Sequence, residues 1–294
     1  MTVIPPPGCP AGGEATEAFA GHRDLLFAVA YGMLGSVGDT EDILARTWQS
    51  WTRGAASGGG PRRRLVEIAV RHALARRSAL RRRRCAYVGP WLPEPLVSPA
   101  DGAADAPVSL ALLVVLEDLP DLERAVFVLS EIAGCDRAEI AEMVGRSPAA
   151  VRHAARQATA QVQARRPRHQ ADPRVRQGIT ARFAAAMLGA DREAFARLLA
   201  PQVAIWTDSG GQAPGAALCG AYRRDRAAQL LAAGSYRPRA EPGVRCRRVN
   251  GDLSLVVTAA GRPYAVLVLD LDPEGGQVCG IYAVTNPDKL ARAG

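Results

Sequence analysis

Arginine residues that could bind a polyanion are concentrated in one part of this 294-residue chain. The whole chain holds 37 basic and 29 acidic residues, and residues 61–100 alone hold 10 basic residues against 2 acidic ones. A guanidinium group donates two parallel hydrogen bonds to a phosphate, so this stretch favours contact with a nucleic-acid backbone over a face that is merely solvated. The candidate contacts, called the arginine stripe below, are Arg62, Arg63, Arg64, Arg71, Arg77, Arg81, Arg82, Arg83 and Arg84.

A second candidate for nucleic-acid binding is a helix, a glycine turn and a second helix between residues 136 and 166. Asp136 with Glu139 predicts a capping box for a helix over 138–144, Gly145 permits the turn, and Ser147 predicts the start of the second helix. In a helix-turn-helix the second helix enters the major groove of DNA. This one holds four arginines and no acidic residue, which favours DNA contact over a hairpin used only for packing. The residues expected near bases and phosphates are Ser147, Ala149, Ala150, Arg152, His153 and Arg156.

Residues with the chemistry for catalysis or metal binding are sparse. The six cysteines form no Cys-x-x-Cys pair and the chain has four histidines, so we expect no metal site and no cofactor. Proton-transfer enzymes use a histidine or a carboxylate with a shifted pKa. No histidine follows His169, so Asp208, Asp225 or Asp252 would have to act alone. The sequence therefore predicts a protein that is not an enzyme.

The elements that must position these residues are helical in the first part of the chain. Apolar residues at helical spacing predict helices over residues 16–34, 39–51 and 62–83, and the last of these leaves the arginine stripe on its outer face. Residues 91–107 contain prolines, glycines and acids and predict a linker, after which residues 109–166 are helical again.

After residue 173 the pattern changes to helices followed by strands. This order predicts an α+β domain with a curved antiparallel sheet, a shape that tends to enclose a pocket. The expected helices cover 174–188, 192–199 and 222–233, and the expected strands cover 203–207, 244–249, 253–259, 264–270 and 278–284.

The chain as a whole is predicted to be multidomain, all-α first and α+β last. No apolar run approaches the roughly 18 to 20 residues that cross a bilayer, and residues 1–13 lack the parts of a secretory signal, so we expect the protein in the cytoplasm. The expected divisions are a disordered tail over 1–15, a helical domain over 16–95, a linker over 96–108, a second helical domain over 109–168 and the α+β domain over 169–294.

Four segments, in this order, resemble extracytoplasmic-function sigma factors of the subgroup with a fused C-terminal SnoaL-like domain. "LLFAVAYGMLGSVGDTEDI" (residues 25–43) resembles sigma region 2, and "LPDLERAVFVLSEIAGCDRAEIAEMVGRSPAAVRHAARQA" (residues 119–158) resembles region 4. "YVGPWLPEPL" (residues 87–96) is similar to the inter-domain motif of that subgroup, and "NPDKL" (residues 286–290) to the end of the SnoaL-like fold. After "EDI" this chain reads "LARTW", where relatives usually have a Gln- or Glu-containing turn.

The resemblance implies a protein that binds core RNA polymerase, recognises the minus-35 and minus-10 promoter elements and initiates transcription. The implied partners are promoter DNA, the clamp helices of the largest polymerase subunit and the flap of the second-largest subunit. The arginine stripe corresponds to the minus-10 surface, and the helix after Ser147 corresponds to the minus-35 surface. The residues implied in core-polymerase binding are Asp39, Glu41, Asp42 and Trp48.

For the SnoaL-like domain the resemblance implies a regulatory contact with the sigma regions. We expect this domain to tune activity by holding regions 2 and 4 in a set orientation, with or without a small ligand in its pocket. Two alternatives remain: a ligand-responsive DNA-binding regulator that acts without polymerase, and a SnoaL-like cyclase or isomerase. The residues expected in the regulatory contact are Trp91, Leu92, Pro93, Glu94, Pro95, Asp208, Gly210, Gly211, Asn286, Pro287, Asp288, Lys289 and Leu290.

Overall fold

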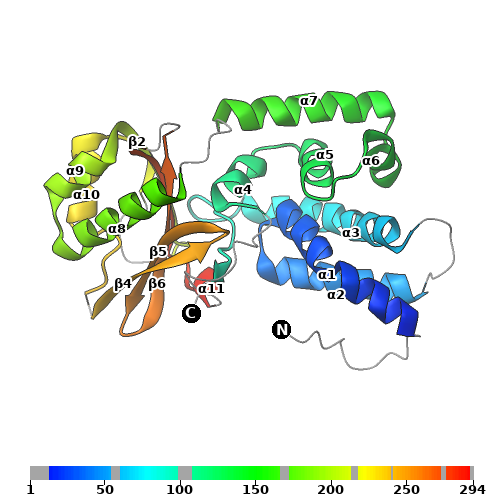
Figure 1. Ribbon diagram of the computed structural model, residues 1–294, viewed down its shortest axis with the longest axis horizontal. Coiled ribbons are helices and arrows are strands. Elements are labelled where there is room, and N and C mark those ends of the chain that lie inside the picture. The colour runs from blue at the N-terminus through cyan, green and yellow to red at the C-terminus, as the bar shows by residue number, and fades with distance from the viewer. Residues whose placement is uncertain are drawn as a thin grey trace. The chain divides into compact units, whose positions relative to one another are not determined.

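The chain folds into two compact units in a computed structural model (Figure 1). The first unit comprises residues 1–85 and 115–165, and the second comprises residues 86–114 and 166–294. Residues 86–95, which the sequence led us to group with the first helical domain, and residues 109–114, which were expected in the second helical domain, therefore cluster with the second unit. The structure describes residues 13–53, 60–98, 108–165, 172–212, 218–239, 241–272 and 276–291, with the backbone alone at Arg83.

Several expected segments fall at the edges of the described residues. Residues 1–12 of the expected tail, 99–107 of the expected linker and 166–168 at the expected end of the second helical domain lie outside them. Residues 13–15, which were expected in the tail, instead begin the first helix.

Three long helices form the first half of the first unit: α1 (Gly13–Leu34), α2 (Val37–Arg53) and α3 (Pro61–Arg84). Each places an apolar face inward, as the helical spacing predicts, and α1 contacts both of the others. Leu26 and Met33 of α1, Ile43 of α2 and Leu65 of α3 are buried in this way. The three helices predicted from the sequence are confirmed.

The second half of the first unit is α5 (Asp121–Glu131), α6 (Arg137–Val144) and α7 (Pro148–Arg165), reached through α4 (Leu110–Glu117). The side chain of Asp136 accepts hydrogen bonds from the amides of Ala138 and Glu139, and the side chain of Glu139 accepts one from the amide of Asp136. Gly145 then takes a left-handed conformation with φ of 63°, which a side chain would disfavour. The predicted capping box, glycine turn and second helix are confirmed.

The second unit is built on a seven-stranded sheet in the order β1-β4-β5-β6-β7-β2-β3. All neighbouring strands are antiparallel except β2 and β7, which are parallel. The α+β fold with a largely antiparallel sheet is confirmed, although the sequence did not predict the short edge strands β1 and β3. The strands are β1 (Val97–Ser98), β2 (Leu199–Asp208), β3 (Cys219–Arg223), β4 (Pro242–Val249), β5 (Asp252–Ala259), β6 (Arg262–Leu271) and β7 (Val278–Val284).

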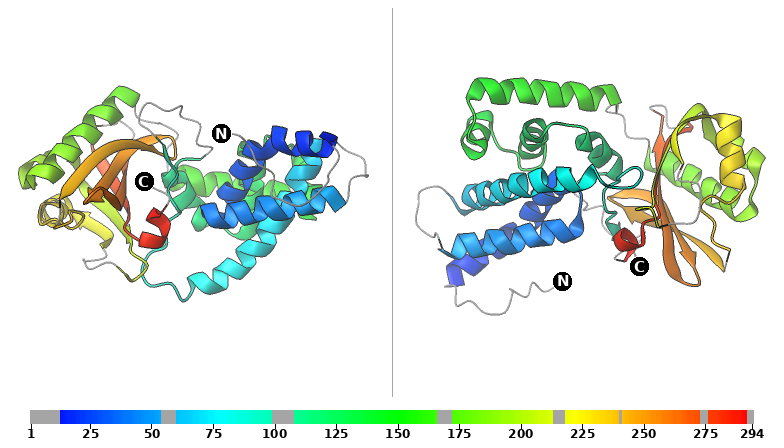
Figure 2. Two further views of the ribbon diagram at one scale, coloured as in Figure 1. Left: turned by 90° about the horizontal axis from the view of Figure 1, so that it is seen from below. Right: turned by 180° about the vertical axis from the view of Figure 1, so that it is seen from behind.

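Both faces of this sheet are covered, which explains why its central strands are apolar at nearly every position. The helices α8 (Pro173–Gly189), α9 (Arg192–Leu198) and α10 (Arg224–Ala232) lie together on one side (Figure 2). Because side chains alternate along a strand, Leu255 packs into the core on that side and Val256 into the core on the other.

The second face is covered by segments from distant parts of the sequence. Its core joins Leu92 before β1, Leu110 at the start of α4 and Leu290 of α11 (Pro287–Leu290) to the strands. No helix in the described part of the chain is long and apolar enough to cross a membrane.

Candidate functional site

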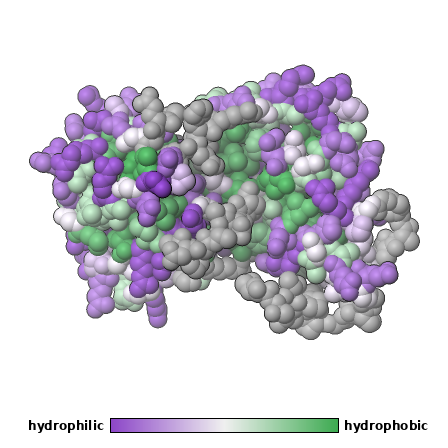
Figure 3. Space-filling view, in the orientation of Figure 1, coloured by the Kyte–Doolittle hydropathy of each residue, from purple (hydrophilic) through white to green (hydrophobic). Residues whose placement is uncertain are grey.

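The outward face of α7 carries the residues that the sequence predicted for the major groove. Arg152, His153 and Arg156 are exposed, while Val151 and Ala154 on the opposite face are buried. No acidic side chain forms an ion pair with Arg152 or Arg156 among the described residues. Hydrophilic side chains gather along this helix in Figure 3. The helix therefore presents an unneutralised cationic face, the surface that a DNA backbone requires.

The N-terminal turn of α7 is formed by small residues. The hydroxyl of Ser147 accepts a hydrogen bond from the amide of Ala150 at 3.2 Å, which caps the helix. Ser147 and Ala149 are exposed and Ala150 is half-buried. Short side chains at this end of the helix leave room for a close approach to base edges.

Six members of the arginine stripe remain at the surface of α3. Arg82 forms no ion pair with any other described residue, and the ion pair of Arg71 is with Glu67 of its own helix at 2.7 Å. Arg63 pairs with Glu142 of α6, so part of the stripe already holds an acidic partner. The side chain of Arg83 lies outside the described atoms. The six surface members are Arg62, Arg63, Arg64, Arg71, Arg81 and Arg82.

Arg77, which was expected to contact DNA, is an internal side chain that is only 4% exposed. Its Nε donates to Oδ1 of Asp121 at 2.7 Å, and its other nitrogens donate to the carbonyls of Met33 and Leu119, each at 3.2 Å. These contacts join α3 to α1 and to the start of α5. The periodicity of an isolated helix could not reveal them, because the partners come from 42 to 44 residues away.

Arg84, also expected on the DNA surface, joins a buried cluster around Glu117. Glu117 pairs with Arg77, with Arg84 and with the fully buried Arg124. Burial alone would raise the pKa of Glu117, but the positive charges of these arginines outweigh it and lower the pKa below its ordinary value. The carboxylate is thus held ionised, and Arg124 also donates to the carbonyl of Gly32 at 2.8 Å. Arg84 therefore stabilises the first unit through its ion pair with Glu117.

The acidic residues implied in polymerase binding differ in their availability. Asp39 accepts a hydrogen bond from Nε of Arg76 at 2.8 Å, and Glu41 accepts one from Arg23 at 3.0 Å. Asp42 is exposed and has no ion pair with any described residue. Of the three carboxylates near the start of α2, only that of Asp42 is without a basic partner within the described chain.

Trp48, also implied in polymerase binding, is 5% exposed. Its ring meets the ring of Phe19 edge to face with the centroids 5.2 Å apart. In this structure Trp48 fastens α2 to α1 and offers no surface to a partner.

The second unit contains a buried carboxylate, Asp208, at the end of β2. Its side chain is fully buried and accepts hydrogen bonds from the hydroxyl of Tyr87 at 2.5 Å and the amide of Leu92 at 2.8 Å. It also accepts from Nζ of Lys289 at 2.6 Å and from the amide of Gly210 at 3.2 Å. Three motifs far apart in the sequence therefore converge on one carboxylate, which we call the Asp208 site.

Lys289 connects the Asp208 site to the segment before β1. Its ammonium lies 4.0 Å from the ring centroid of Trp91, donates to the carbonyl of Leu92 and pairs with Asp208. A cation over an indole face is attracted by the negative face of the ring. Trp91 and Leu92 are thus held through both side chain and backbone.

Tyr87 and Asn286 complete the hydrogen bonding of the Asp208 site. Nδ2 of the Asn286 side chain donates to the hydroxyl of Tyr87 at 2.8 Å, and Oδ1 of the same side chain caps α11 by accepting from the backbone amide of Asp288. Burial, followed by the hydrogen bond to Asp208, raises the pKa of Tyr87 above its ordinary value of 10.0. The tyrosine therefore stays protonated and acts as a donor to the carboxylate.

The glycines after Asp208 are required by the closeness of their neighbours. A Cβ atom at Gly210 would lie 2.5 Å from Nδ2 of Asn286, and one at Gly211 would lie 3.2 Å from Cβ of Val88. Both glycines also have positive φ angles, of 58° and 74°. The loop thus permits the approach of the other two motifs.

The segment that follows Leu92 and leads into β1 is fixed to the sheet by Asn250. The amide of Leu96 donates to Oδ1 of Asn250 at 3.1 Å, and Nδ2 of Asn250 donates to the carbonyl of Val108 at 3.1 Å. β1 then pairs with β4. Sequence reasoning missed Tyr87 and Asn250, although Tyr87 stands at the start of a motif that it singled out.

The residues expected in the regulatory contact all fall within the second unit. Leu92, Asn286 and Leu290 are buried, and Pro287 is exposed. Six of these residues meet at the Asp208 site: Trp91, Asp208, Gly210, Gly211, Asn286 and Lys289. Three more follow Leu92 in the sequence and are buried: Pro93, Glu94 and Pro95. Asp288 is exposed and accepts a hydrogen bond from Gln212 at 3.4 Å.

Comparison with known proteins agrees with this geometry. Residues 109–162 match the family model of sigma-70, region 4. The chain is 30% identical over 292 residues to the ECF RNA polymerase sigma factor SigJ of Mycobacterium tuberculosis, covering 94% of this chain and 93% of that protein. It is 29% identical over 197 residues to the probable ECF RNA polymerase sigma factor SigI of the same organism, covering 64% of this chain and 68% of that one.

A solved structure resembles nearly the whole chain. The crystal structure of Mycobacterium tuberculosis SigJ superposes with a TM-score of 0.72 at 29% identity, covering 95% of this chain and 99% of that one. The likeness therefore includes the helical unit and the sheet domain.

Proposed function

This chain belongs to the extracytoplasmic-function (ECF) RNA polymerase sigma factors, and from that premise we propose how its surfaces divide the work of promoter recognition. The helix-turn-helix of α6 and α7 reads the minus-35 element, the outer face of α3 contacts the minus-10 element, and α2 contacts core polymerase. The second unit tunes this activity through the segment that joins region 2 to region 4.

The observation that carries the minus-35 assignment is the combination of caps and charge in the helix-turn-helix. Asp136, Glu139 and Gly145 fix the angle between the two helices. The exposed Arg152 and Arg156 on α7 lack acidic partners among the described residues. A hairpin used only for packing has no need of unpaired arginines on its outer face, whereas a phosphate backbone supplies their counter-charge.

For the minus-10 element we propose the surface members of the arginine stripe. Arg82 is exposed and has no acidic partner among the described residues, so it can bind a phosphate as the helix stands, whereas Arg71 pairs with Glu67 and Arg81 pairs with Asp121. Arg62 donates to the carbonyl of Ala133, and Arg63 pairs with Glu142. These two arginines bind DNA only if phosphates replace their contacts to the region 4 helices.

The second unit acts, in this proposal, by holding the connecting segment. Residues 86–108 lie between the helices of region 2 and the region 4 match at 109–162, and they belong to the second unit. A free segment of that length reaches at most on the order of 80 Å, which is close to the roughly 85 Å of B-DNA that separates elements centred about 25 base pairs apart. The anchors at Tyr87, Leu92 and Leu96 take residues out of the free length. The Asp208 site thereby limits how far regions 2 and 4 can separate.

In vitro transcription with purified core RNA polymerase tests this proposal. The full-length chain should direct specific transcripts from promoters selected in a genomic library, and a Lys289→Met variant should change their amount. The matched surface control is Arg197→Met, which also removes one positive charge and lies at an exposed position of the same unit.

Each negative outcome is informative. DNA binding without core binding or transcripts would favour the ligand-responsive regulator. Transcripts of unchanged strength from a Lys289→Met variant with a released connecting segment would remove the tuning role and leave the sigma function intact.

A further inference from the structure

The region 2 helices α1 to α3 and the region 4 helices α5 to α7 pack against each other within the first unit. α1 contacts α5, and α3 contacts both α5 and α6. At the start of α3, Arg62 donates to the carbonyl of Ala133, and Arg63 pairs with Glu142 of α6. Region 4 therefore occupies two members of the arginine stripe in this structure.

α1 and α5 approach each other closely at Gly32. A Cβ atom at this position would lie 2.9 Å from Cδ1 of Ile132 and 3.3 Å from Cγ2 of Val128. The carbonyl of Gly32 also accepts a hydrogen bond at 2.8 Å from Nε of Arg124, which is fully buried. A glycine inside a helix weakens that helix relative to alanine. The glycine is explained here by the contact with region 4, which leaves no room for a side chain.

Buried charges fix the orientation of this contact. Nε of Arg77 on α3 donates to Oδ1 of Asp121, in the first turn of α5, at 2.7 Å. Glu117 pairs with Arg84 of α3 and with Arg124 of α5. Charged groups that have lost their water are stable only with their partners in place. The two regions are thus held in one defined arrangement.

The packed arrangement is too small to reach both promoter elements at once. A compact body of about 140 residues is roughly 40 Å across. Elements centred about 25 base pairs apart are separated by roughly 85 Å of B-DNA. Regions 2 and 4 must therefore separate before one chain can bind both elements.

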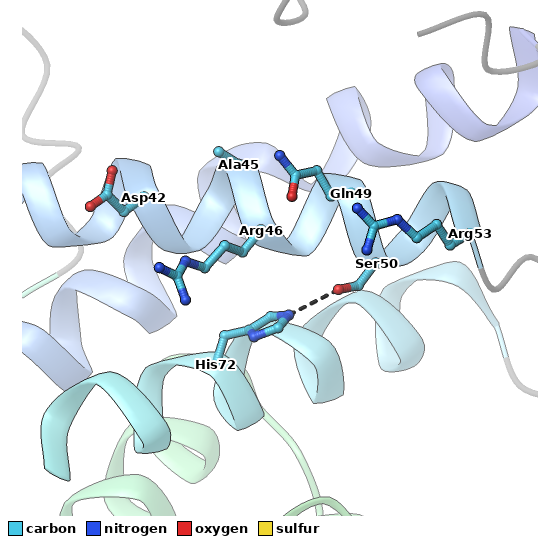
Figure 4. Close-up of a pocket in the computed structure, with 7 residues that line it drawn as sticks. All are labelled: Asp42, Ala45, Arg46, Gln49, Ser50, Arg53 and His72. Atoms are coloured by element: carbon cyan, nitrogen blue, oxygen red, sulfur yellow. Dashed lines mark hydrogen bonds between the residues drawn. The ribbon is translucent and has the colours of Figure 1, made fainter. Parts of the chain in front are cut away.

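Each region has internal contacts that do not depend on the other region. Within region 2, Nε of Arg76 donates to Oδ1 of Asp39 at 2.8 Å. The hydroxyl of Ser50 on α2 lies 3.0 Å from Nε2 of His72 on α3 (Figure 4). Within region 4, α7 contacts both α5 and α6. Separation of the regions therefore leaves the packing inside each of them in place.

We propose that the contact between regions 2 and 4 is an autoinhibitory latch, in which region 4 covers part of the minus-10 surface until the two regions separate. This inference rests on the proposed function and adds that the chain masks its own DNA-binding arginines. Glu142 supplies to Arg63 the negative charge that a phosphate would supply. The latch comprises Gly32, Arg62 and Arg63 of region 2 and Ile132, Ala133 and Glu142 of region 4.

The latch and the Asp208 site have different roles in this proposal. The Asp208 site limits how far the regions can separate, whereas the latch sets how often they separate. A protein that is competent to bind only in its open state has an apparent affinity reduced by the fraction that is open. Loosening the latch should therefore tighten promoter binding by the free chain.

The first test measures energy transfer between dyes at Glu17 on α1 and Gln163 on α7, both exposed, in the full-length chain. The dyes are attached through unnatural amino acids, because the chain has six cysteines. The opening variant is Gly32→Leu, whose side chain cannot fit against α5. The control is Gly21→Leu in the same helix, where a Cβ atom meets nothing within 4 Å.

We expect efficient transfer in the unmodified chain and in Gly21→Leu, and a loss of transfer in Gly32→Leu. Gly32→Leu should also bind a duplex with both promoter elements about 10-fold more tightly than Gly21→Leu does. Far-ultraviolet circular dichroism checks that both variants keep their helices. Equal transfer and equal promoter affinity in the two variants would overturn the inference.

A second variant, Glu142→Arg, loosens the latch from the surface without touching a core. It places a positive charge opposite Arg63 at an exposed position of α6. The control is Glu131→Arg, which makes the same change of charge at an exposed position of α5 that has no ion pair among the described residues. We expect Glu142→Arg to show less transfer than Glu131→Arg and about threefold tighter promoter binding. No difference between the two would count against the mask.

The outcomes separate this inference from the proposed function. Addition of core RNA polymerase and promoter should lower the transfer in the unmodified chain, and unchanged transfer in a complex that makes transcripts would overturn the inference. Loss of transfer in Gly32→Leu, in a protein that neither binds core polymerase nor directs transcripts, would support the latch and count against the proposed function.

Discussion

Nζ of Lys289 lies 2.6 Å from Oδ2 of Asp208, and the two residues, 81 positions apart in the sequence, form an ion pair in which the aspartate is fully buried. Lys289 is the one lysine in a chain with 37 basic residues. A compact ammonium can meet the carboxylate, the carbonyl of Leu92 and the ring of Trp91 at a single point, whereas a planar guanidinium spreads its donors over a wider fork.

Replacing Lys289 by methionine should release the segment before β1. The change leaves the Asp208 carboxylate buried without its cation, which costs about 3 to 5 kcal/mol of stability in comparable cases. Hydrogen exchange at the amide of Leu92, which donates to Asp208, should speed up strongly, and the unfolding midpoint in urea should fall. The Asp208→Asn, Lys289→Met pair serves as a control, because it removes both charges. Unchanged protection of Leu92 in Lys289→Met would contradict the anchoring role.

Gly210→Ala should destabilise the second unit. The added methyl group would lie 2.5 Å from Nδ2 of Asn286, at a φ of 58° that disfavours any side chain. We expect a loss of roughly 1 to 2 kcal/mol or more from the left-handed conformation alone. Gly178→Ala is the matched control: it lies inside α8, where a Cβ meets nothing within 4 Å, so it should stabilise by about 0.5 to 1 kcal/mol. Equal effects of the two substitutions on thermal unfolding would refute this account of the loop.

Arg82→Ala should affect DNA binding, whereas Arg77→Ala should affect the stability of the fold. Arg82 is exposed, so its loss should lower the slope of log binding constant against log salt by about 0.9 if it holds one phosphate of duplex DNA. Arg77 is buried among Asp121, Met33 and Leu119, so its loss should cost about 3 to 5 kcal/mol of stability. Anisotropy titrations at several salt concentrations, with unfolding curves alongside, separate the two effects. A stable Arg77→Ala protein with a reduced salt slope would reverse the assignment.

Arg152→Ala tests whether α7 reads sequence or only holds the backbone. A base contact should cost about 1 to 3 kcal/mol on the preferred minus-35 sequence and relax preference at one position. A phosphate contact should weaken binding to all sequences alike. Arg174→Ala, at an exposed position of α8, is the control and should change neither quantity. Undiminished affinity of Arg152→Ala for every duplex would exclude this arginine from the interface.

Glu117 should make the protein lose stability in acid. Its folded pKa is held below the ordinary value of 4.5, so the unfolded chain takes up the proton first as pH falls. The stabilisation from its ionised form is therefore complete above about pH 4.5 and is lost as pH falls through the folded pKa. Glu117→Gln should be less stable near neutral pH and should show a shallower decline in acid. An equally steep decline in both proteins, followed by urea unfolding at each pH, would show that other groups dominate.

The elements set by neighbouring residues could be read from the sequence. The capping box joins Asp136 to Glu139, three positions away, and Gly145 ends the helix by its own backbone freedom. The helical spacing of α1 to α3 and the apolar strands of the sheet follow from which faces must be buried. These features depend on residues that are close together in the sequence, so they can be predicted from the sequence alone.

The two short edge strands could not be read in this way. β1 has two residues, and β3 alternates between exposed and half-buried positions, so neither leaves an apolar pattern. β1 pairs with β4 and β3 pairs with β2, because each of these longer strands offers backbone N–H and C=O groups that would otherwise be unpaired at the sheet edge.

The sequence by itself determined which residues carry charge, that the first part of the chain is helical, and that a helix-turn-helix with a cationic outer face precedes an α+β domain. Only the tertiary structure decided that Arg82 faces solvent while Arg77 is buried, because packing partners from distant segments select between neighbouring positions of one basic helix. It also decided that Tyr87, Asp208 and Lys289 meet, since a buried carboxylate needs donors that no nearby residue supplies. Local hydrogen bonds join residues that are close in the sequence, whereas the neutralisation of a buried charge depends on the whole folded chain.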